Sequence, residues 1–132
     1  MAGRKACVVV VDDDEAVRAA LSQLLQLNSY NVRSFSSAAE FLESLSTERP
    51  DCLVLDIFMP ELGGLDVLHY LRRHMIAIPT VVVTAQGEEG LHDRCRNAGA
   101  ASVLVKPVLS DIFFQAIESA MRGAPKHMGS RA

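Results

Sequence analysis

Residues 6–27 read ACVVVVDDDEAVRAALSQLLQL, and two patterns that decide the fold meet in this stretch. Its first part, residues 6–11, is an unbroken apolar run rich in valine, which is typical of a strand buried on both faces of a parallel sheet. Apolar side chains then recur at spacings of three and four, as on one face of a helix, at Val17, Ala20, Leu21, Leu24 and Leu25. A buried strand is therefore followed by an amphipathic helix, with acidic residues at the junction.

The same strand-and-helix unit recurs along the rest of the chain. We expect further strands at residues 32–35, 52–55, 79–84 and 102–105. We expect further helices from Ser36 or Ser37 to the break at Arg49-Pro50, and at residues 65–73, 88–97 and 110–121. Ser37 and Glu40 have the spacing of a capping box, and Ser110 can cap the last helix. Strict alternation of strands and helices predicts an α/β fold built on a parallel sheet.

Composition limits the class of protein. The 132 residues are 49% hydrophobic and 22% charged, which is typical of one globular domain; we assign it to residues 1–122 and expect residues 123–132 to be a disordered tail or linker. A net charge of −3 argues against binding of nucleic acid by this domain. No apolar run approaches the roughly 20 residues that span a bilayer. Three cysteines without CxxC spacing favour a reduced, cytoplasmic setting over a disulfide framework.

The chemistry is expected at the carboxyl ends of the strands, where parallel sheets place their sites. The polar residues delivered there are Asp12, Asp13, Asp14, Glu15, Asp56, Thr84 and Lys106. Neighbouring carboxylates repel one another, and Mg²⁺, which prefers oxygen ligands, would relieve that repulsion. Asp56 could then stay anionic and act as a nucleophile toward a phosphoryl group, whose oxygens Mg²⁺, Lys106 and the Thr84 hydroxyl could neutralise.

Each of these signals also has a simpler interpretation. Acids after a first strand often cap the next helix and favour its dipole, and Asp14 and Glu15 are interpreted in this way. Asp56 alone could be a turn residue, Thr84 alone a strand residue, and Lys106-Pro107 alone a turn. The signals become specific only in combination, because the acids, the threonine and the lysine all stand at the carboxyl ends of expected strands and in the right order along the chain.

Four segments of the chain are distinctive: VVVVDDDEAVR at 8–18, LVLDIFMPELGGLDVL at 53–68, PTVVVTA at 79–85 and GAASVLVKPV at 99–108. Together they resemble the response-regulator receiver domain of the CheY-like superfamily. Thr84 and Lys106 are 22 residues apart (106 − 84), as is usual in such domains. The resemblance covers about residues 5–122 and implies a flavodoxin-like, doubly wound (βα)5 sheet with strand order 2-1-3-4-5.

The resemblance also implies a role for each site residue. Asp12 and Asp13 match the acidic pair that holds Mg²⁺, and Asp56 matches the phosphoacceptor and third metal ligand. Phe58 matches the position whose main-chain carbonyl reaches the metal. Thr84 matches the switch hydroxyl, and Lys106 matches the lysine that pairs with the phosphoryl group and commonly precedes a cis proline bond.

The implied function is a two-component phosphorylation switch. A sensor histidine kinase or phosphotransfer protein donates the phosphoryl group, and the domain catalyses only its own phosphorylation and dephosphorylation. The segments VDDDEAVR and SFSSAAEFL are most similar to the FixJ-like branch, whose members carry a C-terminal helix-turn-helix, so transcriptional control is expected. Such receivers often dimerise through helix four, strand five and helix five when phosphorylated.

Two other functions remain as alternatives. One is a receiver-like interaction module that is never phosphorylated, although such modules lose an acid or the lysine and this chain keeps them all. The other is a haloacid-dehalogenase-like phosphatase, whose DxD spacing Asp12 and Asp14 satisfy, although such enzymes are larger and need another acidic motif.

The chain departs from the receiver pattern at Val103, where an aromatic switch residue is common. Either another apolar side chain packs there, or the switch is altered. Phe58 and Gln86 occupy positions that influence phosphoryl hydrolysis in the family, and an apolar Phe58 is expected to hinder the attacking water. His69, His74, His92 and His127 have no metal-ligand spacing and are expected on the surface.

Overall fold

The computed structural model describes residues 5–85 and 87–123. It contains five strands and five helices in strict alternation, in the order β1 (Cys7–Val11), α1 (Glu15–Leu27), β2 (Asn31–Phe35), α2 (Ala38–Ser44), β3 (Cys52–Leu55), α3 (Gly64–Arg73), β4 (Thr80–Thr84), α4 (Leu91–Asn97), β5 (Ser102–Val105) and α5 (Ser110–Gly123). All strand pairs are parallel, and the strand order is β2-β1-β3-β4-β5. The flavodoxin-like fold expected from the sequence is confirmed.

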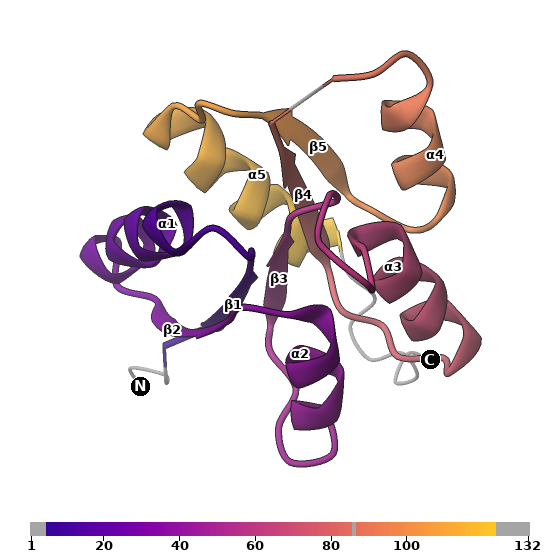
Figure 1. The fold of residues 1–132 in the computed structure, drawn as a ribbon. Helices are drawn as coiled ribbons and strands as arrows, with labels where there is room; N and C mark the ends of the chain where they lie inside the picture. Colours follow the sequence, from indigo (N-terminus) through magenta and orange to yellow (C-terminus); the bar gives the residue numbers. More distant parts are fainter. Residues whose placement is uncertain (1–4, 86, 124–132) are drawn as a thin grey trace.

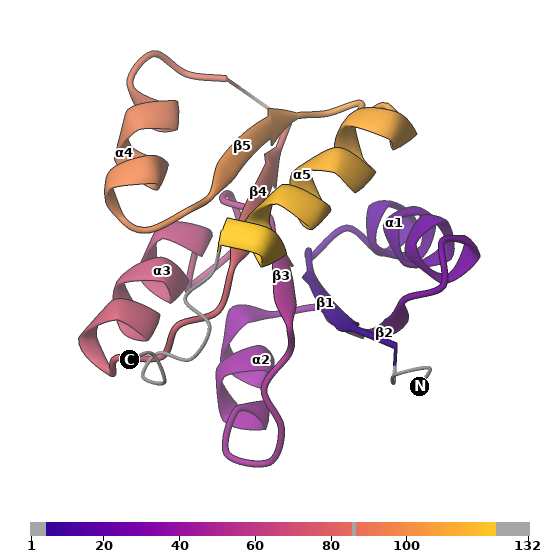
Figure 2. The same cartoon turned by 180° about the vertical axis from the view of Figure 1, so that it is seen from behind.

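Helices cover both faces of the sheet (Figures 1 and 2). Successive strand residues point to opposite faces, so each continuous apolar strand supplies two cores. On one face Val9, Leu53 and Val82 pack with buried residues of α2, α3 and α4. On the other face Val8, Val54 and Val81 pack with buried residues of α1 and α5. The cysteines are free and buried, and Cys7 and Cys52 lie in strands as the apolar runs predict.

The limits of the elements agree with the sequence pattern except near helix ends. Helix α4 begins at Leu91, three residues later than expected. Gly90 directly precedes it with φ of 84°, which is outside the range of a right-handed helix, so the helix can start only after Gly90. Helix α5 continues to Gly123, beyond the expected end at Met121. The expected tail, apart from Gly123, lies outside the described residues.

Capping explains where two helices start. The Ser37 hydroxyl accepts a hydrogen bond from the Glu40 main-chain N–H at 3.2 Å, which is one half of the expected capping box. The Glu40 carboxylate instead accepts from the Ser36 hydroxyl at 3.4 Å. Asp14 caps α1 by accepting from the main-chain N–H groups of Ala16 and Val17. In the part of the chain that the structure describes, no helix is both long and apolar enough to cross a bilayer.

Candidate functional site

The ends of four strands bring the expected polar residues to one edge of the sheet. Asp12 directly follows β1, Asp56 directly follows β3, Thr84 is the last residue of β4 and Lys106 directly follows β5. The register aligns these ends, because Val11 pairs with Leu55 and Thr84 pairs with Val105. Side chains separated by up to 94 positions in the sequence therefore meet at the carboxyl edge.

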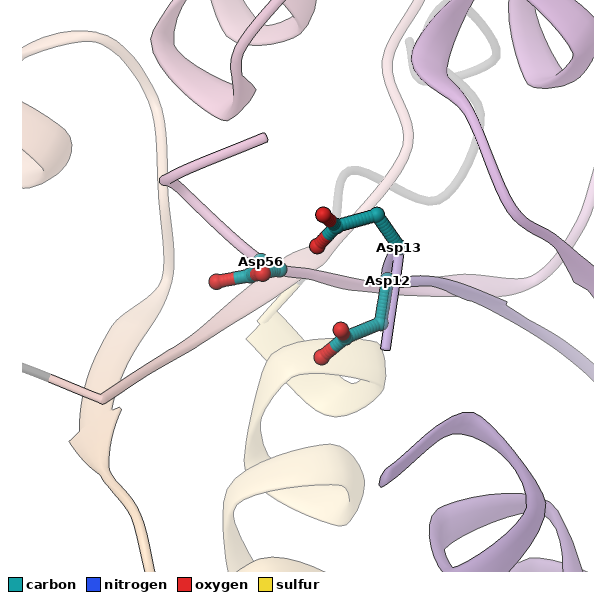
Figure 3. A group of neighbouring side chains, drawn as sticks. All are labelled: Asp12, Asp13 and Asp56. Atoms are coloured by element: carbon teal, nitrogen blue, oxygen red, sulfur yellow. The ribbon is translucent and has the colours of Figure 1, made fainter. Parts of the chain in front are cut away.

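Three carboxylates form the centre of this site. One ligand oxygen each from Asp12, Asp13 and Asp56 lies within 4.8 Å of the others, and Figure 3 shows the three side chains turned toward a common space. Asp12 and Asp56 are buried, whereas Asp13 is exposed to solvent. A group of oxygen ligands that is open on one side suits Mg²⁺, which keeps several of its waters. The donor set therefore fits the cation implied by the sequence.

Asp56 is an unusual carboxylic acid because only 6% of its surface is exposed. Burial, helped by the nearby negative charge of Asp12, raises the pKa of Asp56 to about 6. Lys106 and a main-chain hydrogen bond from Phe58 act in the opposite direction but do not cancel the effect of burial. The folded chain thus disfavours the Asp56 anion unless an additional cation compensates for it.

Lys106 places a positive charge beside two of these acids. Its Nζ lies 3.0 Å from Asp12 Oδ2 and 4.0 Å from Asp56 Oδ1. The closer partner is therefore Asp12, and the lysine bridges two carboxylates that would otherwise repel each other. The bond from Lys106 to Pro107 is cis, as the resemblance implies.

Asp12 is held through its main chain as well as its carboxylate. The main-chain N–H of Asp14 donates to Asp12 Oδ1 at 2.9 Å, and Arg18 Nη1 donates to the Asp12 main-chain oxygen at 2.7 Å. No sequence motif assigns Arg18 a role. A signal for it exists, since helical side chains lean toward the N-terminus of their helix and Arg18 is in the first turn of α1.

Two glycines shape the loop that follows Asp56. The main-chain N–H of Gly64 donates to the Ile57 main-chain oxygen at 3.0 Å, and that of Gly63 donates to Asp66 Oδ2 at 3.0 Å. A Cβ atom added at Gly64 would lie only 2.5 Å from the main-chain oxygen of Asp56. The close approach of backbone to the site, expected from these glycines, is confirmed at Gly64.

The remaining residues of interest differ in exposure. Thr84 is fully buried, the Phe58 side chain is 46% exposed, and Val103 is partly buried against the core beneath α3 and α4. The three described histidines, His69, His74 and His92, are exposed as expected. His127 and Gln86, for which the sequence also gave expectations, lie outside the described residues.

Most of the chain matches a known protein family. The model of the response regulator receiver domain matches residues 8–118. The response regulator protein TodT of Pseudomonas putida is 34% identical over 126 residues, which are 96% of this chain and 56% of TodT. MprA of Mycobacterium ulcerans is 41% identical over 100 residues, 76% of this chain and 43% of that response regulator. The chain thus spans about half the length of these curated relatives.

Solved structures agree with this match. The crystal structure of FixJ-N superposes with a TM-score of 0.84 at 32% identity, covering 92% of this chain and 97% of that one. The response regulator StyR superposes with a TM-score of 0.80 at 37% identity, covering 89% of this chain and 60% of that one. The order of the strands, the acids gathered at their carboxyl ends and these matches lead to one conclusion: the chain belongs to the response regulator receiver domain family of two-component signalling proteins.

Proposed function

We propose that Asp56 is the residue that accepts the phosphoryl group. The observation that carries this proposal is the position of Asp56, which is buried beside two further carboxylates and 4.0 Å from the Lys106 ammonium group. Asp56 Oδ attacks phosphorus, a new P–O bond forms, and the bond from phosphorus to the donor histidine nitrogen breaks. The imidazole leaves with the electron pair and regains a proton.

The other residues of the site have separate roles in this proposal. Asp12, Asp13, Asp56 and the main-chain carbonyl of Phe58 hold Mg²⁺, which neutralises charge on the phosphoryl oxygens when bound. Lys106 leaves its position near Asp12 to pair with a phosphoryl oxygen, and the Thr84 hydroxyl donates to another. Lys106 already lies within 4.0 Å of both carboxylates, so this exchange requires only a short movement of its side chain.

We further propose that the phosphoryl donor docks beside Lys106. A groove of about 410 Å³ lies there, lined by Val17, Ala20, Leu21 and Leu24 of α1 and by residues 106–108 among others. An apolar groove next to a helix suits the apolar face of an amphipathic helix. The occupant we infer is the histidine-bearing helix of a sensor kinase or phosphotransfer protein, because that histidine must reach Asp56.

The Mg²⁺ site makes a direct prediction for thermal stability. Mg²⁺ with beryllofluoride, a phosphoryl mimic, should raise the melting temperature by several degrees relative to EDTA, since a ligand at 100 times its Kd stabilises a protein by about 2.7 kcal/mol. Circular dichroism would measure the shift. Asp13→Asn should lose most of it, while Asp93→Asn, an exposed change on α4, should keep it. Equal shifts in the two variants would contradict the assignment of the metal ligands.

We propose that the phosphorylated chain forms a dimer through an apolar surface near β5. Strand β5 is an edge strand, and near it Val105, Leu109 and Ile112 are respectively 50%, 67% and 47% exposed. Beryllofluoride should therefore convert the chain to a dimer in size-exclusion chromatography, and Ile112→Asp should remain monomeric because it places a charge in the apolar contact. A wild-type chain that stays monomeric under both conditions would refute this surface.

Phe58 is proposed to slow hydrolysis of the phosphorylated state. Its side chain follows Asp56 by two positions and is 46% exposed, so it can shield the phosphoryl group from water. Phe58→Asn should shorten the half-life of the phosphorylated chain severalfold, measured as loss of label after removal of the donor. Leu27→Asn, at an exposed apolar position at the end of α1, is the matched control and should leave the half-life unchanged. An unchanged half-life in Phe58→Asn would remove this role.

The output is proposed to be transcriptional control, as expected from the similarity to the FixJ-like branch. The unphosphorylated interaction module is a weaker alternative, because the acids and the lysine are not only retained but brought together at one edge. In a phosphatase that uses Asp12 as nucleophile, Asp12→Asn rather than Asp56→Asn would abolish labelling. Asp14, the second acid of that DxD spacing, caps α1 through its carboxylate, which weighs against this phosphatase alternative.

A further inference from the structure

We propose that Arg18 is a positioning residue for the divalent cation, acting through the peptide group that joins Asp12 to Asp13. This inference rests on the proposed function, because it assigns a residue that prepares the same site. Arg18 Nη1 donates to the Asp12 main-chain oxygen at 2.7 Å, and the contact is partly buried. A guanidinium donor makes this hydrogen bond charge-assisted and hence stronger than a neutral one.

The position of this contact allows it to affect both Asp12 and Asp13. The Asp12 carbonyl and the Asp13 N–H belong to the same planar peptide group. The orientation of this group therefore sets the position of the Asp13 Cα atom, from which the Asp13 carboxylate extends. Asp12 N–H donates to the Phe35 main-chain oxygen at 3.2 Å, which anchors the preceding peptide to β2. Arg18 provides the corresponding restraint on the following side, where β1 has ended.

Three contacts together restrain Asp12 on every polar atom beyond its N–H. Asp14 N–H holds Oδ1 at 2.9 Å, Lys106 Nζ holds Oδ2 at 3.0 Å, and Arg18 holds the main-chain oxygen at 2.7 Å. Lys106 must leave in the proposed mechanism, and Asp14 restrains only the carboxylate. Arg18 is thus the contact that keeps the Asp12–Asp13 peptide oriented while Lys106 moves.

The geometry of α1 makes this arrangement possible. Asp14 caps the helix, which begins at Glu15, so Arg18 lies one turn inside it. A helical side chain leans toward the N-terminus, and the long arginine stem then reaches the end of β1. Metal ligands are tuned by the groups that orient them, and loss of such a group typically weakens metal binding by about tenfold or more.

The test compares two variants of Arg18 that separate the effect of its hydrogen-bond donor from that of its apolar stem. Arg18→Met keeps an apolar stem but removes the donor, whereas Arg18→Lys keeps a cationic donor. Isothermal titration of Mg²⁺ into each chain should give a Kd about tenfold higher for Arg18→Met, and a Kd near that of the wild type for Arg18→Lys. Arg122→Met, an exposed change on α5, is the matched control and should bind as the wild type does.

Thermal melting in EDTA provides the readout for a purely structural role. If Arg18 only stabilised the fold, Arg18→Met would melt earlier yet bind Mg²⁺ with unchanged Kd once folded, and this would overturn the proposal. Arg18→Lys binding as weakly as Arg18→Met would also overturn it. A wild-type chain that binds no Mg²⁺ would instead refute the proposed function, so the two failures are distinguishable.

Discussion

Asp56→Asn should take up no phosphoryl group from radiolabelled acetyl phosphate in the presence of Mg²⁺. An asparagine amide has no anionic oxygen that can attack phosphorus, and the other two acids of the cluster, Asp12 and Asp13, follow β1 and not β3. Incorporation is measured as label retained by the chain after gel filtration. The expected level is that of wild-type chain incubated in EDTA.

The variant is expected to fold, so that loss of label reports chemistry and not unfolding. Burial raises the pKa of Asp56 to about 6, which means that the folded state is destabilised by the Asp56 anion at neutral pH. Removing this charge should leave the melting temperature in EDTA unchanged or higher. Asp111→Asn, at an exposed position in the first turn of α5, is the control that should label normally. Normal labelling of Asp56→Asn would contradict the account.

Gly64→Ala should destabilise the domain by about 2–3 kcal/mol and slow its phosphorylation. The added Cβ would lie 2.5 Å from the Asp56 main-chain oxygen, 2.7 Å from Ile57 Cδ1 and 2.9 Å from Ile57 Cα. Two of these atoms are backbone, so no rotamer change relieves the contact and the loop after Asp56 must move. Alanine is ordinarily better than glycine in a helix, and the expected result therefore has the opposite sign to helix propensity.

Urea denaturation measures the loss of stability, and Gly123→Ala is its matched control. Gly123 ends α5, and a Cβ there would meet no atom within 4 Å. We expect that variant to differ from wild type by less than about 0.5 kcal/mol. If Gly64→Ala were as stable as Gly123→Ala, the close approach of the α3 N-terminus to Asp56 would not describe the protein in solution.

The strands and the residues at their ends were the most predictable part of the molecule. Continuous apolar runs such as residues 8–11 and 52–55 can hardly be placed other than in a covered parallel sheet, and the parallel order then brings Asp12 and Asp56 to one edge. The approach of Asp12, Asp13 and Asp56 to within 4.8 Å follows from that order.

Other features depend on three-dimensional detail that a linear pattern does not contain. The start of α4 is set by the positive φ of Gly90, whereas the preceding glutamates favour a helix. Lys106 lies closer to Asp12 than to Asp56, which depends on side-chain geometry. The contact from Arg18 to the Asp12 main chain joins a helix to a strand end and has no sequence motif of its own.

The most direct test of the central claim maps the phosphorylated residue in the unmodified chain. The chain is incubated with acetyl phosphate and either Mg²⁺ or EDTA, the acyl phosphate is reduced with borohydride, and the peptides are sequenced by mass spectrometry. We predict that the reduced residue is Asp56 and that it forms only with Mg²⁺. Modification of Asp12 or Asp13 in its place, or equal modification of Asp56 in EDTA, would contradict the account.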